Sequence, residues 1–360
     1  MALVLKNLTI LHMRGNDDFA DLLSRAAFHY TSLILKMFFN PVLAVGGVSS
    51  NIVNMVIFFK MGLKEGTTQS FVVLSVTDGL AALASFANTV CYILLYAIYG
   101  GTAGGSRNMF ITYCITLMSI PYLLNLSTLI TTVIAVVRCC CVVMPLRVKQ
   151  VLTAGRQLMA IVIISCIICS VQLYATASVR FSLFVDPRTN ASRIHLTGIK
   201  IVLLDAFRNT FCYFTLSVVM LCVAILGVAL KQAARFHSSA SGQLVASPPS
   251  GNSKRQTNTR EIQVMKTVIF IAFIFVISNI PTALVAVLRL NIEGFSRTGR
   301  YRDFYNCYLV IAETCCLMNI NANIFIYFFF NRLYHSSFCI LFKLKHKHVL
   351  EEKNATKTQN

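Results

Sequence analysis

Seven long apolar runs, each long enough to cross a lipid bilayer, follow one another along the 360-residue chain. A hydrocarbon core of about 30 Å requires about 20 apolar residues in a helix. Within a single span, a helix is the structure that satisfies every backbone hydrogen bond internally. The runs predict an all-α membrane protein, with a seven-transmembrane helix bundle over 33–330. The expected spans are 33–59, 70–98, 109–137, 157–179, 210–230, 264–288 and 305–330.

Polar segments organise the rest of the chain. Residues 1–32 are expected to form an extracellular tail, and the Ser-, Gly- and Asn-rich loop 231–263 to be partly disordered inside the cell. Residues 331–344 place apolar residues between basic ones, which predicts a short amphipathic helix at the membrane interface. Cys339 in that helix is a candidate for palmitoylation. Residues 345–360 would form the cytoplasmic tail.

Composition agrees with this organisation: 56% of the residues are hydrophobic and 12% are charged. Lys and Arg are more frequent in the loops that lie inside if the N-terminus is outside. We therefore expect a multi-pass plasma-membrane protein with an extracellular N-terminus. The glycosylation sequons at Asn7 and Asn190 fall on the outer side in this topology. Most of the 13 cysteines lie in apolar runs, where they act as small hydrophobic residues.

Single polar residues interrupt several apolar runs near their middle, and they include Asn51, Asp78, Ser127, Asn319 and Asn323. Polar side chains at this depth are costly, and they usually face the bundle interior and serve a function. We expect the last four to converge between the second, third and seventh spans. Their oxygens suit a small hard cation. A hydrated polar network without an ion is the alternative.

The order and spacing of these residues resemble the rhodopsin-like (class A) G-protein-coupled receptors, over residues 33–345. The resemblance rests on Asn51, the LxxxD motif at 74–78, Ser127 eleven residues before Arg138, Pro145, Glu261, Phe275, Pro281, and the NPxxY-like motif at 323–327 with Asn319 upstream.

This resemblance implies a two-state switch at the inner face. Arg138 is expected to pair with Glu261 at rest and to be released when the sixth span swings outward. Tyr327, Pro281 and Phe275 would take part in the same movement. The resemblance also implies an allosteric sodium ion at Asp78 and Ser127, with no other cofactor.

Several positions depart from the family pattern. Val137 replaces the acidic neighbour of the arginine, Asn279 stands at the position of the sixth-span tryptophan, and Ile324 replaces the seventh-span proline. Cys114 lies one residue away from the usual outer cysteine, which puts the usual outer disulfide in doubt. The run 136–149 is similar to divergent molluscan chemosensory receptors, and to neuropeptide receptors of the same animals.

The ligand is constrained mainly by exclusion. The third span lacks the aspartate of amine receptors, and the seventh span lacks the lysine of visual opsins. Basic residues near the outer ends, among them Arg208 and Arg289, favour an anionic ligand such as an acidic peptide or a small carboxylate. The alternative is that these charges only face water. Glu313 would contact a cationic part of the ligand or pair with an arginine.

The predicted function is that of a receptor that converts extracellular ligand binding into activation of a heterotrimeric G protein. Arrestin and a receptor kinase are further expected partners, besides membrane lipid. Two alternatives stay open: a seven-helix channel or transporter subunit, and a receptor fold that binds ligand without coupling. The chain carries no hydrolytic triad, zinc motif, P-loop or dinucleotide fingerprint, so we expect neither an enzyme nor a nucleic-acid-binding protein.

Overall fold

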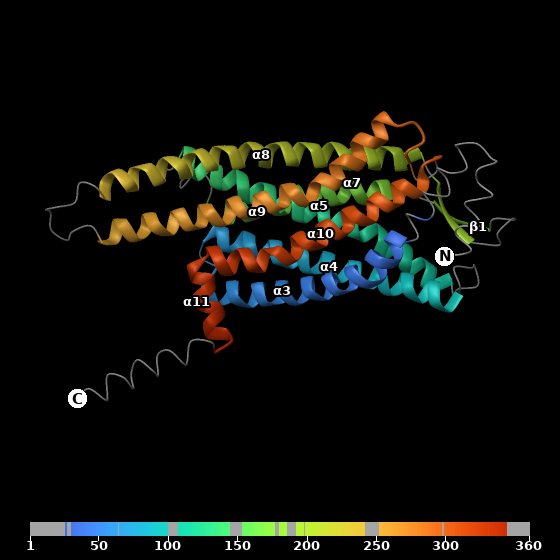
Figure 1. Cartoon of the computed structure of the whole chain (residues 1–360), viewed down its shortest axis with the longest axis horizontal. Helices are drawn as coiled ribbons and strands as arrows, with labels where there is room; N and C mark the ends of the chain where they lie inside the picture. The colour runs from blue at the N-terminus through green and yellow to red at the C-terminus, as the bar shows by residue number, and fades with distance from the viewer. Residues whose placement is uncertain are drawn as a thin grey trace, which may run out of the picture.

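A computed structural model describes residues 26, 30–63, 65–99, 107–144, 153–176, 180–185, 192–197, 199–241, 252–296 and 299–343. Long helices lie side by side along the long axis of the molecule, and a short helix turns away at one end (Figure 1). The elements are the π-helix η1 (Ser32–Phe39), α3 (Asn40–Met61), α4 (Gly66–Tyr99), α5 (Arg107–Val143), α7 (Ala154–Thr176), β1 (Arg180–Val185), β2 (Ser192–Thr197), α8 (Ile199–Ser241), α9 (Asn252–Asn291), α10 (Arg302–Phe330) and α11 (Arg332–Leu341).

The chain is a helical membrane protein. Within the described residues, six helices are long and apolar enough to cross a membrane, and α7 contains a shorter apolar segment, Gly155–Val171. Helix α3 buries polar side chains and exposes apolar ones, which is the opposite of a helix in a water-soluble protein and is expected of a membrane helix. Asn51 and Asn54 are fully buried, while Val42 and Phe59 are 72% and 57% exposed. The predicted fold class is therefore confirmed.

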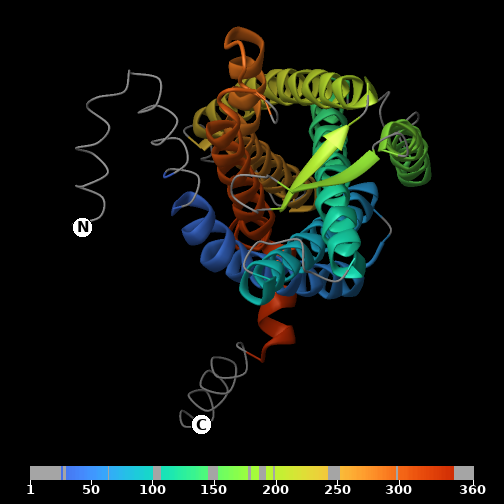
Figure 2. The same cartoon turned by 90° about the vertical axis from the view of Figure 1, so that its right-hand side faces the viewer.

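The ends of the expected elements differ in two places. Helix α8 begins at Ile199 and continues to Ser241, and α9 begins at Asn252. The expected inner loop 231–263 is thus largely helical at both of its ends, because an apolar span can propagate a helix into polar sequence once it is nucleated. Before α8, β1 and β2 form an antiparallel hairpin with Phe181 opposite Leu196, which the sequence analysis did not predict. The hairpin lies across one end of the bundle (Figures 1 and 2).

Glycines bring α3 close to α4 and α10. A Cβ atom on Gly47 would lie 3.0 Å from Ala82 Cβ and 3.1 Å from Ile320 Cγ2. One turn earlier the backbone is joined directly, since Asn321 Nδ2 donates to the Leu43 carbonyl at 2.8 Å. Small residues and side-chain hydrogen bonds are the usual means of joining helices within a bilayer.

Helix α11 follows α10 after a sharp turn at Asn331, which has extended backbone angles and whose side chain caps α11 by accepting from the Tyr334 N–H. Tyr334 is fully buried against the bundle, while Leu333 and Ile340 are exposed. The interfacial helix was thus predicted at the right place, but its main anchor was missed. Cys339 is buried, so acylation of its thiol would require α11 to open; the structure disfavours the predicted palmitoylation.

Candidate functional site

A cavity of about 170 Å³ lies between α5, α8, α9 and α10. Its walls are mostly apolar, with contributions from Ile120, Leu124, Phe211, Phe275 and Leu309. Cavities of this kind are the usual sites for small molecules in helical bundles. A dry cavity of roughly 150 Å³ holds benzene in another protein, which sets the scale for an occupant here.

Local backbone chemistry helps to shape this cavity. Pro121 lies inside α5, where it cannot donate to the Leu117 carbonyl, and both residues line the cavity. Pro281 interrupts α9 in the same way, next to Thr282 in the wall. Asn279 also lines the cavity, at the position where the resembling receptors carry a tryptophan. A smaller side chain at this position leaves more space between the helices.

The polar groups of the cavity are few and distinct. Glu313 is the charged residue among those that line it. Asn125 Nδ2 is buried without a hydrogen-bond partner in the described part of the chain, so it is an unused donor. Asn279 Nδ2 is already used, because it donates to the Phe275 carbonyl at 2.8 Å. An occupant would therefore meet a mostly apolar surface, the free amide donor of Asn125, the carboxylate of Glu313, and the neutral polar side chains of Thr128, Thr282 and Asn319.

The floor of the cavity continues into a buried hydrogen-bond network. Ser127 lines the cavity, and its hydroxyl donates to Asp78 Oδ1 on α4. Asn323 Nδ2 on α10 donates to Asp78 Oδ2 at 2.8 Å. Asp78 is 1% exposed. The structure thus brings Asp78, Ser127 and Asn323 together from three spans, and Asn319 also lines the cavity.

The expected sodium site does not match the donors that face Asp78. Asp78 and Ser127 would supply oxygen ligands, but both carboxylate oxygens already accept hydrogen bonds. The third group, the amide nitrogen of Asn323, is a donor and would repel a cation. As arranged, Ser127 and Asn323 supply the hydrogen bonds of the Asp78 carboxylate without an ion.

Asn51 belongs to a second relay that the sequence analysis did not separate from the first. Its side chain donates to the Gly47 carbonyl and accepts from Asn54. Asn54 in turn accepts from the Tyr334 hydroxyl of α11. Burial raises the pKa of the Tyr334 phenol, which keeps it a donor. This relay joins the first span to α11.

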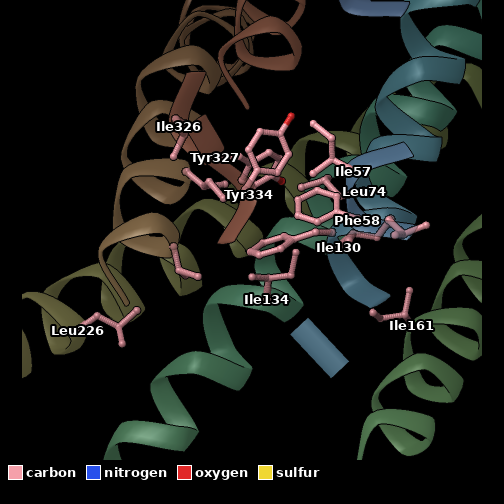
Figure 3. Close-up of a cluster of buried hydrophobic side chains, with 14 residues drawn as sticks. Ile57, Phe58, Leu74, Ile130, Ile134, Ile161, Leu226, Ile326, Tyr327 and Tyr334 are labelled. Atoms are coloured by element: carbon pink, nitrogen blue, oxygen red, sulfur yellow. The ribbon is translucent and has the colours of Figure 1, made fainter. Parts of the chain in front are cut away.

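Among the predicted switch residues, Tyr327 and Arg138 lie toward the α11 end of the molecule, whereas Phe275 and Pro281 lie at or next to the cavity. Tyr327 is fully buried, with its ring 5.0 Å from those of Phe58 and Phe71 and 5.5 Å from that of Tyr334 (Figure 3). Arg138 is half-buried in the last turns of α5. Phe275 is buried in the cavity wall.

Other predicted positions lie outside the described residues or away from the cavity. Glu261 is in α9 and Arg208 is in α8, but the side chains of both are outside the description, as are Asn7 and Asn190 altogether. Arg289 is in the last turn of α9 and does not line the cavity. All 13 cysteines are free thiols, which agrees with the doubt about an outer disulfide.

Three residues near the site were missed: Tyr334, Asn125 and Lys36. Lys36 is a buried cation in η1, 8% exposed. A lysine inside the first apolar run was a readable signal, since such residues are rarely kept in a membrane without a function. Asn125 lies within the third apolar run, where its amide was the readable signal. The aromatic character of Tyr334 hid its polar role.

Comparison with known proteins places the chain in a family. No curated protein matches it. The model of the Srg family chemoreceptor matches residues 43–247, more than half of the chain, from within α3 to beyond the end of α8. The resemblance to molluscan receptors is not supported, because the matching family is a different one. The six membrane-spanning candidates and the shorter apolar helix of the described residues, the cavity among them and this match lead to one conclusion: the chain belongs to the Srg family and is a multi-pass membrane chemoreceptor, a serpentine chemosensory receptor without enzymatic activity.

Proposed function

We propose that this chemoreceptor binds a small, mostly apolar molecule in the cavity between α5, α8, α9 and α10, and that binding activates a heterotrimeric G protein. One observation carries the proposal. Ser127 lines the cavity and also donates to Asp78, so a ligand at the cavity floor adjoins a network that joins α4, α5 and α10. A ligand that favours one arrangement of this network shifts the population of receptor states.

The polar groups of the cavity define the ligand further. An apolar body would fill the space beside Ile120, Phe211 and Leu309. An oxygen acceptor would use the free amide donor of Asn125. We replace the anionic ligand of the sequence analysis with such a molecule, because the charged group in the wall is a carboxylate. Arg289 would act only by long-range attraction outside the cavity.

The expected topology assigns the hairpin end to the outside of the plasma membrane and the α11 end to the cytoplasm. In this arrangement, outward movement of α9 would release Arg138 from Glu261 and open an inner cleft for the G protein. Pro281 removes one backbone hydrogen bond from α9 and thereby offers this helix a hinge beside the cavity. Arrestin and a receptor kinase would bind the same inner face.

A second reading is a receptor that binds ligand without coupling. Val137 favours it, because this buried apolar residue stands beside Arg138 where coupling receptors carry an acid. The two readings differ in what happens to the G protein, and not in the ligand site. One experiment separates them.

The test is nucleotide exchange on a promiscuous Gα subunit by receptor in lipid nanodiscs. We expect Glu261→Ala to raise ligand-free exchange severalfold, since it removes a restraint on α9, and Arg138→Ala to abolish that rise. Small neutral benzene derivatives are then added to the wild type and to Asn279→Trp, whose indole fills the cavity. Ile277→Trp is the matched control, because Ile277 is two residues away and 50% exposed toward lipid.

Stimulation that survives in Ile277→Trp but is lost in Asn279→Trp would support the cavity as the ligand site. Absence of exchange in every variant, with normal surface expression, would contradict G-protein coupling and favour the non-coupling reading. Equal responses of the two tryptophan variants to the ligand would contradict the assignment of the cavity as the ligand site.

A further inference from the structure

A buried cation lies at the hairpin end of the bundle, close to the cavity but not in its wall. Lys36 belongs to η1, where Pro41 follows closely and disturbs regular α-helical bonding. Its side chain is 8% exposed, inside an apolar span of 29 residues. Such a lysine is costly unless other groups compensate its charge.

Three side chains from three other helices provide that compensation. Lys36 Nζ lies 4.4 Å from the ring centre of Tyr92 on α4 and 5.7 Å from that of Tyr113 on α5. Aromatic faces attract an ammonium group, and more strongly where water is excluded. The third group is the Glu313 carboxylate on α10, which attracts Lys36 electrostatically and also bonds to Ser85.

A direct hydrogen bond fixes the two helices beside this pair. Thr314 Oγ1, next to Glu313, donates to Asn40 Oδ1 at 2.7 Å, one turn after Lys36. Asn40 is fully buried and Thr314 is 5% exposed. The first and seventh spans are therefore joined one turn from Lys36 and directly beside Glu313.

Glu313 faces two ways, since it lines the cavity and also interacts with Lys36. An uncompensated carboxylate in an apolar wall would select organic cations, because a cation would relieve its burial cost. With Lys36 behind it, the pair has no net charge. We propose that Lys36 is the counter-ion of Glu313, and that it sets the selectivity of the cavity for neutral ligands against organic cations.

The selectivity role of Lys36 rests on the proposed ligand site, whereas its pairing with Glu313 does not. The pairing itself is tested without ligand, by thermal unfolding of the purified receptor in nanodiscs. Lys36→Met and Glu313→Gln each leave one buried charge without its partner, so each should lower the Tm by about 3 °C or more. The double variant removes both charges and should recover most of the loss. Lys60→Met, at the exposed opposite end of the same helical span, should leave the Tm unchanged.

Additive losses in the double variant would overturn the pairing, whatever the receptor binds. The selectivity is tested with three probes of nearly equal size: benzyl alcohol, benzylammonium and benzoate. Binding in the cavity is measured as the ligand-induced shift in Tm that is absent in the Asn279→Trp variant. In the wild type benzyl alcohol should bind best. In Lys36→Met the affinity for benzylammonium should rise about tenfold, and in the double variant that gain should disappear.

The outcomes separate the two proposals. Cavity-dependent binding of benzyl alcohol without a gain for benzylammonium in Lys36→Met overturns the selectivity role and leaves the ligand site intact. No cavity-dependent binding of any probe, in any variant, overturns the ligand site and the selectivity role together, while the stability cycle still decides the pairing.

Discussion

Two buried tyrosines of one aromatic cluster differ in a single hydrogen bond. The Tyr334 hydroxyl donates to Asn54, whereas the Tyr327 hydroxyl is buried without a partner in the part of the chain that the structure describes. A buried polar group without a partner costs about 1–3 kcal/mol. Tyr327 therefore weakens the arrangement it belongs to, and a state that offers its hydroxyl a partner would recover that energy.

The matched variants Tyr327→Phe and Tyr334→Phe test this difference. We expect Tyr327→Phe to stabilise the receptor by about 1 kcal/mol, because it removes an unpaired hydroxyl, and Tyr334→Phe to destabilise it by a similar amount. Thermal unfolding in nanodiscs measures both. Destabilisation by Tyr327→Phe would show that its hydroxyl is bonded after all.

At the scale of the elements, the approach of α3 to α4 and α10 depends on the absence of a side chain at Gly47. Contacts of 3.0 and 3.1 Å for an added Cβ leave no room for further atoms. Gly227 in α8 is the contrast, because nothing lies within 4 Å of its Cβ position. Glycine thus permits close helix packing at position 47 and has no packing role at position 227.

Valine at each position should reveal the difference. Gly47→Val should cost about 2–3 kcal/mol by overpacking and lower the yield of folded receptor. Gly227→Val should be nearly neutral, since its side chain points into open space. The two variants are compared by their size-exclusion profiles and Tm values. Equal losses of stability would mean that helix propensity, and not packing, determines the effect of the substitution.

At the scale of the whole molecule, Ser127 joins the cavity to the Asp78 network, and we propose that ligand binding is transmitted through it. This residue faces the cavity and holds Asp78, while its neighbour Thr128 also lines the cavity but makes no recorded bond to Asp78. Loss of the Ser127 hydroxyl would thus leave the binding surface nearly intact and weaken the connection between α4 and α5.

Ser127→Ala and Thr128→Ala separate binding from transmission. We expect Ser127→Ala to reduce maximal ligand-stimulated nucleotide exchange about fivefold or more, with ligand-induced Tm shifts close to those of the wild type. Thr128→Ala should change potency alone. Parallel effects in the two variants would argue against transmission through Asp78.

Predictions from the sequence were accurate for features that depend on many residues, such as apolar spans. They were less accurate for features that depend on a few contacts between helices. Apolar length located the six helices of the described residues that are long enough to cross a membrane, as well as the shorter apolar helix α7. The cost of burying Asp78, Ser127 and Asn323 indicated that they would meet. The hairpin before α8, the separate relay of Asn51 and the cavity-facing donor of Asn125 depend on how helices rotate and pack. No local pattern encodes that rotation.

The attachment of α11 has one more consequence. The Tyr334–Asn54 bond and the ring of Phe58 fasten α11 to the first span, although it follows the seventh in the chain. Asn331, with its extended backbone, is the joint between them. If α10 shifts relative to α3 during signalling, the Tyr334–Asn54 bond would keep α11 attached to α3, and the change in angle between α10 and α11 would fall on Asn331.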